Sequence, residues 1–247
     1  AWENADFEKM EEIRKRAETV VDDKETAEKL KAWYRQLCKR PCFHDDYLGA
    51  YNEPSTTLVD TNGKGVEEIV EDGVIVNGEH FPLDCLIYAS GFEVGTPHTE
   101  RTGFDLEGVG GVRLSEHWKD GMRTLHGTHV HGFPNAFIVQ PTQGANLISN
   151  VPHNLTESGR TIAMVVKQAL DQGYQTVEVS EEAEQAWIDL LLTGPGRMIG
   201  SQECTPGYYN NEGQEPGPAA RLSVGYPQGA TAYFKYLKDW RESGSFN

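Results

Sequence analysis

The first part of the chain shows a helical pattern of polar and apolar positions. In residues 6–37, apolar residues recur every three or four positions among charged ones, which is typical of amphipathic helices. Asp22 and Asp23 interrupt this pattern and are suitable caps between two helices. We therefore predict two helices, whose charged face is more often solvated than bound to a partner.

From Pro54 onward, the pattern changes to short apolar runs separated by turn residues. Residues 66–70 and 73–76 alternate in polarity, and Asn77-Gly78 after them is a strong turn signal. This predicts short strands joined by tight turns. Further short strands are predicted at residues 56–60 and 135–139.

The most informative apolar run lies in residues 81–89. Four apolar residues, 85–88, follow Asp84, and the small residues Ala89-Ser90-Gly91 come next. We predict a strand buried on both faces, as in a parallel α/β sheet, where cofactors bind just beyond the carboxyl end of a strand. Small residues at such a point let the backbone approach a cofactor closely.

The second half of the chain is mainly helical in pattern. Residues 150–171 form a long amphipathic stretch, and Gly173 is a suitable C-terminal stop. Two shorter helices are predicted at residues 181–192 and 233–240. Residues 194–230 are rich in Gly, Pro and Asn, which predicts a loop.

Composition excludes some classes of function. The 247-residue chain has a formal net charge of −16, which argues against a general nucleic-acid or anionic-membrane surface. No apolar run approaches the roughly 18 residues of a membrane span. The N-terminus has neither an initiator Met nor a signal-peptide profile, and we interpret it as an internal cut. The four cysteines form no CxxC pair, so we expect reduced thiols in the cytoplasm rather than disulfides.

Lys39 and Arg40 are adjacent cations in an otherwise acidic region. Such a pair can hold a phosphate, or stabilise an anion in a pocket of low dielectric constant. On these two residues alone, a surface ion pair is the commoner explanation.

Three histidines, His126, His129 and His131, lie within six residues. Their spacing is compatible with a metal site. However, no acid or Cys lies close by in sequence to complete the site, and Gly127 and Gly132 indicate a loop. We expect a loop that lines a pocket, and no metal site.

Several segments together resemble the Baeyer–Villiger type of flavin-dependent monooxygenase. Residues 84–92 are similar to the D-x-hydrophobic-hydrophobic-x-A-(T/S)-G-F pattern of flavin-dependent monooxygenases, above all of the Baeyer–Villiger type. Residues 39–60 resemble the K-R … D-Y … (F/Y)-N … L-V-D series of the Baeyer–Villiger type, and residues 125–137 resemble its L-G/H-G … G-F-P-N-x-F segment. Residues 204–213 look like the mobile loop that closes over NADP, but they lack the Trp that many members place there.

The resemblance implies FAD and NADP as cofactors and assigns roles to four residues. Arg40 would lie at the flavin and stabilise the flavin peroxide anion and the intermediate formed after its attack on a ketone. Lys39 would help to hold the 2′-phosphate of NADPH. Asn150 and Val151 would contact the flavin pyrimidine through their backbone at a helix N-terminus, which suits an anionic reduced flavin. The implied reaction inserts one oxygen atom from O2 next to a ketone carbonyl, on bulky or cyclic ketones, to give an ester or lactone.

The Gly-rich turns of such an enzyme are missing, because no G-x-G-x-x-G motif occurs in the sequence. We therefore predict an α/β fold that is the C-terminal part of a Rossmann-like flavoprotein with FAD and NADPH domains. A helical insert would occupy residues 1–38, part of the NADPH domain residues 39–91, and part of the FAD domain residues 92–247, with a mobile loop near 194–230. An N-terminal portion of the same enzyme would be the partner, without which the chain would neither hold FAD nor turn over.

Two alternatives share part of this pattern. An N- or S-oxygenating flavin monooxygenase also contains the A-(T/S)-G-F segment, whereas a binding module derived from the same fold would have no catalytic role. The Lys39-Arg40-Pro41 context and residues 204–210 favour the Baeyer–Villiger type.

Overall fold

A computed structural model describes residues 2–36, 38–91, 98–140, 142–145, 149–194, 204–207 and 222–244. The chain forms two compact units. Unit 1 comprises Ala1–Val94 with Gln202–Gly213, and unit 2 comprises Gly95–Ser201 with Gln214–Asn247. Within the described ranges, no helix combines the length and apolar character that crossing a bilayer requires.

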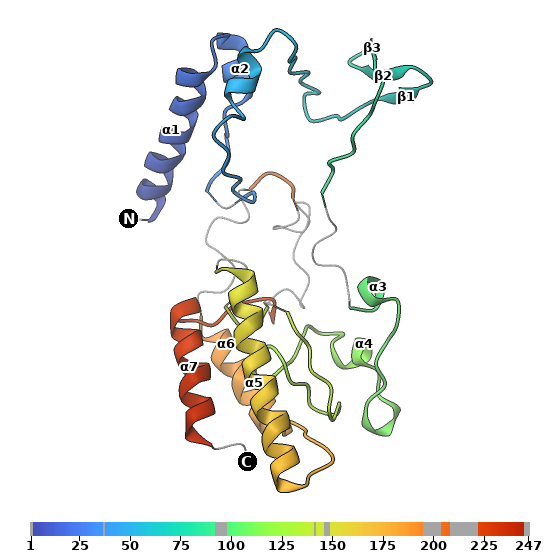
Figure 1. Ribbon diagram of the computed structural model, residues 1–247, viewed down its shortest axis with the longest axis vertical. Helices are drawn as coiled ribbons and strands as arrows, with labels where there is room; N and C mark the ends of the chain where they lie inside the picture. The colour runs from blue at the N-terminus through green and yellow to red at the C-terminus, as the bar shows by residue number, and fades with distance from the viewer. Residues whose placement is uncertain are drawn as a thin grey trace. The chain divides into compact units, whose positions relative to one another are not determined.

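Unit 1 begins with the two predicted helices, α1 (Trp2–Val20) and α2 (Lys24–Lys29), which pack side by side (Figure 1). Asp23 caps α2, because its side chain accepts a hydrogen bond of 2.8 Å from the backbone N–H of Thr26. Asn52, at the end of the short helix η1 (Gly49–Asn52), bonds the backbone of both Val20 and Asp22. The turn between α1 and α2 is therefore stabilised by Asn52 as well as by the Asp23 cap.

Three short antiparallel strands follow in unit 1: β1 (Glu68–Val70), β2 (Gly73–Val76) and β3 (Glu79–Pro82). Asn77 and Gly78 form the turn between β2 and β3, and both have positive φ angles, 52° and 77°. These angles are typical of the tight hairpin turn that the Asn-Gly pair predicted. The predictions for residues 66–78 are confirmed in outline.

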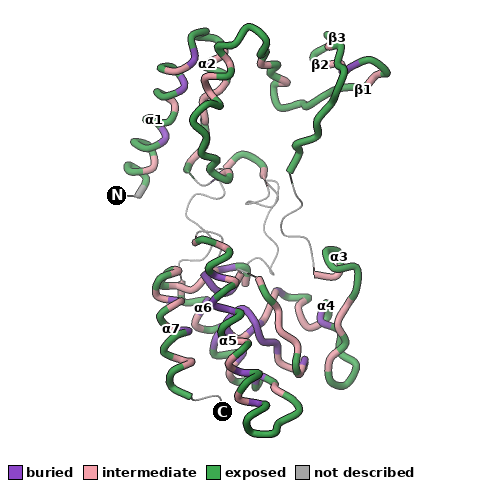
Figure 2. Tube along the Cα trace, in the orientation of Figure 1, coloured by how far each residue is buried: buried purple, intermediate pink, exposed green. Residues whose placement is uncertain are grey.

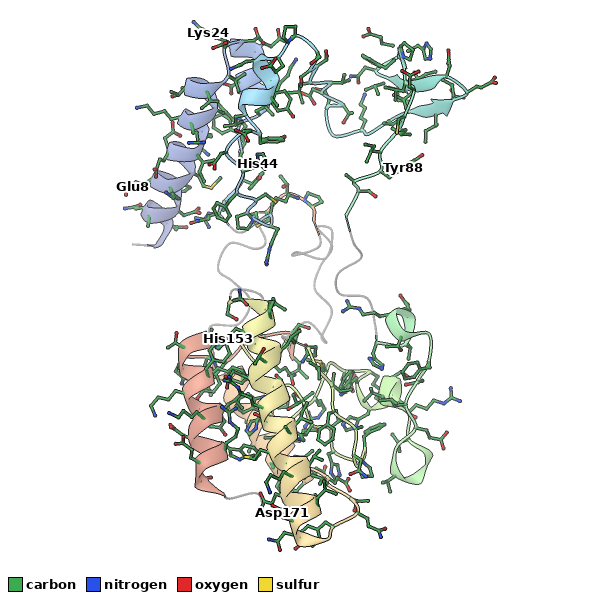
Figure 3. All side chains as sticks on the ribbon, in the orientation of Figure 1. Glu8, Lys24, His44, Tyr88, His153 and Asp171 are labelled. Atoms are coloured by element: carbon green, nitrogen blue, oxygen red, sulfur yellow. A yellow bond between two sulfur atoms is a disulfide. The ribbon has the colours of Figure 1, made fainter. Side chains whose placement is uncertain are left out.

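The prediction of a buried strand at residues 81–89 is wrong for this structure. Strand β3 ends at Pro82, and residues 83–91 are exposed and unpaired by any strand among the described residues. Ile87 and Tyr88 are 82% and 72% exposed, and Figure 3 shows the Tyr88 side chain on this extended segment. The physical reason is that an apolar run becomes a buried strand only where neighbouring strands pair with it, and the described residues supply none. Phe92, the last residue of the motif, lies outside the described residues.

Two other predicted strands are also absent from the described structure. Residues 56–60 have no strand hydrogen bonding, and residues 135–139 form only one isolated bridge, between His129 and Phe137. Both segments are short, and the described residues provide neither of them with a long partner strand.

Unit 2 is built on three helices, α5 (Val151–Gln172), α6 (Glu181–Leu192) and α7 (Ala230–Ser243), which confirms the sequence prediction. Gly173 ends α5 with a φ angle of 72°, as expected for a C-terminal glycine. Shorter helices α3 (His98–Thr102), η2 (Val109–Gly111) and α4 (Leu114–His117) precede them.

The described residues of unit 2 form two hydrophobic clusters. The larger cluster joins α6 and α7 to the segments before α5 and α7, and its members are Ala145, Trp187, Ile188, Leu191, Val224, Tyr233 and Leu237. The smaller cluster consists of Leu114, Val130 and Phe133. Figure 2 shows the buried positions concentrated among α5, α6 and the irregular segments beside them. An ion pair of 2.8 Å between the buried Glu157 and the partly buried Arg241 also links α5 to α7.

Candidate functional site

The first candidate region surrounds Lys39 and Arg40 in unit 1. Lys39 is half-buried and Arg40 is exposed. The Lys39 ammonium donates hydrogen bonds to the backbone carbonyls of Pro206 and, at 3.4 Å, of Thr205. Gly207 also lies close to this ammonium group, since a Cβ atom at Gly207 would lie 2.8 Å from Lys39 Nζ. The ammonium group therefore lies directly against the backbone of residues 205–207.

A disulfide joins the same two segments, which corrects the expectation that all cysteines are reduced. Cys38 is bonded to Cys204, with 5.3 Å between their Cα atoms, a separation within the normal range for disulfides. The two cysteines are 166 positions apart, so no local spacing could have revealed the pair. Cys42 and Cys85 are free and exposed.

The second candidate region is the N-terminus of α5 in unit 2. Asn150 is the N-cap, and its side-chain oxygen accepts a hydrogen bond of 3.0 Å from the backbone N–H of His153. Figure 3 labels His153 at this end of the helix. The first backbone N–H groups of a helix have no partner within the helix and carry a partial positive charge. No acidic residue lies in the first turn of α5, so Asn150 and Val151 begin a helix end that is suited to an anion.

Gln143, which the sequence analysis missed, fixes the chain just before α5. Its side chain is fully buried and accepts a hydrogen bond of 2.6 Å from Thr124 Oγ1. It also donates to the carbonyls of Met122 and Leu222. Two other segments, residues 122–124 and Leu222, therefore meet at the Gln143 side chain, four positions after the predicted strand at 135–139. A polar residue in a Pro-Thr-Gln-Gly turn gave no signal of this role.

The three histidines do not converge on a common point. His131 Nδ1 lies 2.9 Å from the carbonyl of Val179, and His129 Nδ1 lies 3.0 Å from Thr128 Oγ1. The third ring, His126, is enclosed by aromatic side chains, and its neighbours are Trp187, Tyr236 and Trp240. Across the described ranges, no group of three or more His, Cys, Asp or Glu side chains is arranged to hold a metal ion.

Burial leaves two of these histidines neutral. It lowers the pKa of His126 to about 3, and the nearby His129 adds to that shift. Burial also lowers the pKa of His129 to about 4, partly offset by a contact with the backbone of Leu125. These rings are parts of the folded core, since desolvation disfavours their charged forms.

Glu184 of α6 is a buried carboxylate that holds the loop containing these histidines. Its oxygens accept hydrogen bonds from the backbone N–H of His131 at 3.0 Å and from Arg123 Nε at 3.3 Å. Burial raises the pKa of Glu184, but the contact with His117 Nε2 at 3.5 Å and those with His131 and Arg123 outweigh it and leave the pKa below its usual value. The carboxylate is thus charged, and Arg123 and the backbone N–H of His131 stabilise that charge. Its role here is to position the loop.

Comparison with curated proteins gives matches along almost the whole chain. "Pentalenolactone D synthase" of Streptomyces arenae is 47% identical over 247 residues, which cover 99% of this chain and 42% of that protein. "Baeyer-Villiger monooxygenase ATR8" of Stachybotrys chlorohalonatus is 40% identical over 241 residues, covering 97% of this chain and 38% of the relative. The chain thus spans about two fifths of the length of the curated relatives it matches. No family model matches it.

Solved structures agree with this result. A polycyclic ketone monooxygenase from Thermothelomyces thermophila matches 97% of this chain and 39% of its own, with 38% identity and a TM-score of 0.88. An oxidised steroid monooxygenase bound to NADP matches 98% of this chain with 24% identity and a TM-score of 0.78, which concerns the fold alone. The predicted fold class, part of a flavoprotein with FAD and NADPH domains, is confirmed.

Proposed function

We propose that this chain, which belongs to the Baeyer–Villiger monooxygenases and corresponds to a C-terminal portion of one, contributes to inserting one oxygen atom from O2 next to a ketone carbonyl. The product would be an ester or a lactone. The observation that carries this proposal is the 40% identity to the Baeyer–Villiger monooxygenase of Stachybotrys chlorohalonatus along 97% of this chain. The Lys39-Arg40 pair and the α5 N-terminus lie within this matched region.

FAD and NADPH are the proposed cofactors. When bound, FAD reduced by NADPH supplies activated oxygen. The N-terminus of α5 would suit the flavin pyrimidine through the backbone N–H of Val151 and the positive helix end, which favours negative charge, whereas Pro152 has no N–H and that of His153 is bonded to Asn150. Asn150 and Val151 would make this contact through the backbone, with the cap at Asn150 keeping the helix end in place.

Arg40 is the proposed catalytic residue. A guanidinium remains charged at every relevant pH. It can therefore stabilise the negative charge that develops on the ketone oxygen as the carbonyl carbon becomes tetrahedral. Lys39 directly precedes Arg40, and hydrogen bonds to backbone carbonyls already hold its ammonium group. It would bind the 2′-phosphate of NADPH.

Substrate, partner and location follow from the same proposal. The polycyclic ketone monooxygenase among the similar structures favours bulky or cyclic ketones as substrates. The Gly-rich nucleotide loops would come from an N-terminal portion of the same enzyme, and residues 39–91 and 92–247 would complete its NADPH and FAD domains. The cytoplasm is the proposed location.

We expect the 247-residue chain alone to be colourless, and to bind FAD only with that N-terminal portion.

The decisive variant is Arg40→Ala in the chain combined with the N-terminal portion. We expect ester formation from a cyclic ketone to fall by about 100-fold or more, as when a charge-stabilising donor is removed from an active site. Flavin absorbance should persist, because the α5 contact is untouched. Lys39→Ala is the matched control. It should raise the KM for NADPH and leave the rate of the oxygenation step unchanged.

Undiminished ester formation by Arg40→Ala would show that Arg40 is not the catalytic residue. A tertiary amine offered in place of the ketone distinguishes the related N-oxygenating activity. Conversion of the amine without conversion of the ketone would overturn the Baeyer–Villiger assignment.

A further inference from the structure

We propose that Cys38 and Cys204 form a reversible redox modification site that controls how tightly the neighbouring Lys39 binds NADPH. The effect on NADPH rests on the proposed function. The redox chemistry of the cysteine pair does not depend on it, and the two can be tested separately.

The cysteine pair and the lysine contact join the same two short segments. Cys38 precedes Lys39 directly, and Cys204 precedes Thr205 and Pro206, whose carbonyls accept the Lys39 hydrogen bonds. One covalent and one polar link therefore lie side by side. Breaking the covalent link changes what holds the backbone of residues 205–207 at the ammonium group.

The position of the disulfide determines which sulfur a reductant reaches. Cys38 is 4% exposed, whereas Cys204 is half-buried. A thiolate of a dithiol reductant would therefore attack Cys204 Sγ, the sulfur–sulfur bond would break, and Cys38 would leave as a thiolate. The adjacent cations Lys39 and Arg40 favour that thiolate.

The second thiol of the reductant completes the exchange. It attacks its own sulfur in the mixed disulfide and expels Cys204 as a thiolate. The reductant becomes a disulfide, two electrons pass to the protein, and the two protons lost by the reductant protonate Cys38 and Cys204. A disulfide oxidant reverses the same steps. In a reducing compartment such a bond is regulatory rather than permanent.

The oxidised form presents Lys39 in a fixed orientation. The two carbonyls that accept from its ammonium are neutral, so the positive charge remains available to a phosphate. Two of its three N–H donors bond carbonyls of the described residues, and the proposal assigns the third to the ligand. Fixing a long side chain before binding removes part of the entropy cost of binding. After reduction, the 166-residue separation between the cysteines is no longer closed by a covalent bond, and this advantage is lost.

The first experiment follows the cysteines themselves. The 247-residue chain, alone and with the N-terminal portion, is equilibrated in dithiothreitol buffers of graded potential, and its thiols are alkylated and located by mass spectrometry. We expect Cys38 and Cys204 to become alkylated together, while Cys42 and Cys85 are alkylated throughout. Cys85→Ser should retain the Cys38–Cys204 bond. Independent alkylation of Cys38 and Cys204, or a bond between Cys42 and Cys204, would overturn the proposal.

The second experiment measures the KM for NADPH in the oxidised and reduced forms of the reconstituted enzyme. We expect reduction to raise this KM by about tenfold, within the range typical of coupling between two sites, with kcat unchanged. Cys38→Ser and Cys204→Ser should have the high KM in both conditions, and reduction of the unaltered chain serves if either variant fails to fold.

The outcomes separate the two proposals. If the pair titrates but Lys39→Ala leaves the KM for NADPH unchanged, then the role of Lys39 in the proposed function is wrong. If Lys39→Ala raises the KM but the redox state of the pair does not, then the proposed control by the disulfide is wrong.

Discussion

Gly144 illustrates how one missing side chain shapes unit 2. A Cβ atom at Gly144 would lie 2.9 Å from Tyr233 Oη and 3.0 Å from a carbon of its ring. The ring cannot move aside easily, because Tyr233 is 1% exposed and its hydroxyl donates a hydrogen bond of 2.9 Å to the carbonyl of His126. The close approach of the turn to α7 therefore requires glycine.

Gly144→Ala should lower the free energy of unfolding of unit 2 by about 2 kcal/mol, since overpacking a well-filled core typically costs 1–3 kcal/mol. Gly159→Ala is the matched control. Gly159 lies inside α5 with open space around it, so this change should stabilise the protein by roughly 0.5–1 kcal/mol. Urea unfolding followed by circular dichroism measures both. Equal effects of the two substitutions would show that the Tyr233 contact does not decide the cost.

At the residue scale, the sequence predicts contacts within a few positions and misses distant ones. Asn150 was recognisable at a helix start because its partner, His153, is three residues away. Gln143 bonds residues up to 79 positions away, and Cys38 pairs with a residue 166 positions away. Such contacts depend on how separate segments meet in three dimensions, which local patterns do not encode.

At the scale of elements, the N-terminus of α5 combines a structural role with a proposed cofactor role. Asn150→Ala removes the hydrogen bond to the backbone N–H of His153 and should cost about 1 kcal/mol of stability. Asn150→Ser should keep both the cap and FAD binding, because the proposed flavin contact uses the backbone.

Asn150→Asp separates these two roles. It preserves the cap but places a negative charge where the proposal puts an anionic flavin. We expect normal thermal stability and FAD binding weaker by about 1 kcal/mol, roughly fivefold. Flavin fluorescence of the reconstituted enzyme measures the affinity. FAD affinity equal to that of Asn150→Ser would place the flavin elsewhere.

The helices were easier to predict than the strands for a physical reason. A helix closes its hydrogen bonds within one segment, and the periodic stretches at 150–171 and 181–192 contain what α5 and α6 need. A strand depends on a partner. Residues 73–76 pair with residues 79–82 across a tight hairpin turn, whereas residues 83–91 pair with no strand among the described residues.

At the scale of the whole molecule, acid should act on unit 2 through its two buried histidines. The pKa values of His126 and His129 are lowered to about 3 and about 4, against about 6.5 in an unfolded chain. Below pH 6.5, the unfolded state therefore binds protons that the folded state does not. The free energy of unfolding should fall by about 1.4 kcal/mol per pH unit for each histidine. The effect of His129 ends near pH 4 and that of His126 near pH 3, where the folded state also takes up the proton.

Hydrogen exchange of α5, α6 and α7, measured by mass spectrometry between pH 7 and pH 4, can follow this loss in unit 2 itself. Burial raises the pKa of Glu157, but hydrogen bonds from Arg241 and Arg160 outweigh it and leave the pKa below its usual value. The stability that this carboxylate contributes is therefore also lost as the pH falls, so the variants His126→Gln and His129→Gln are needed to isolate the histidine contribution. Gln can adopt the positive φ angle of His126, 55°, since Gln143 has 60° in this structure. Each variant should flatten the dependence of stability on pH by about 1.4 kcal/mol per unit between pH 6.5 and 4. An unchanged slope would mean that water reaches these rings in the folded state, and that the aromatic enclosure around His126 opens far more readily than its contacts with Trp187 and Trp240 suggest.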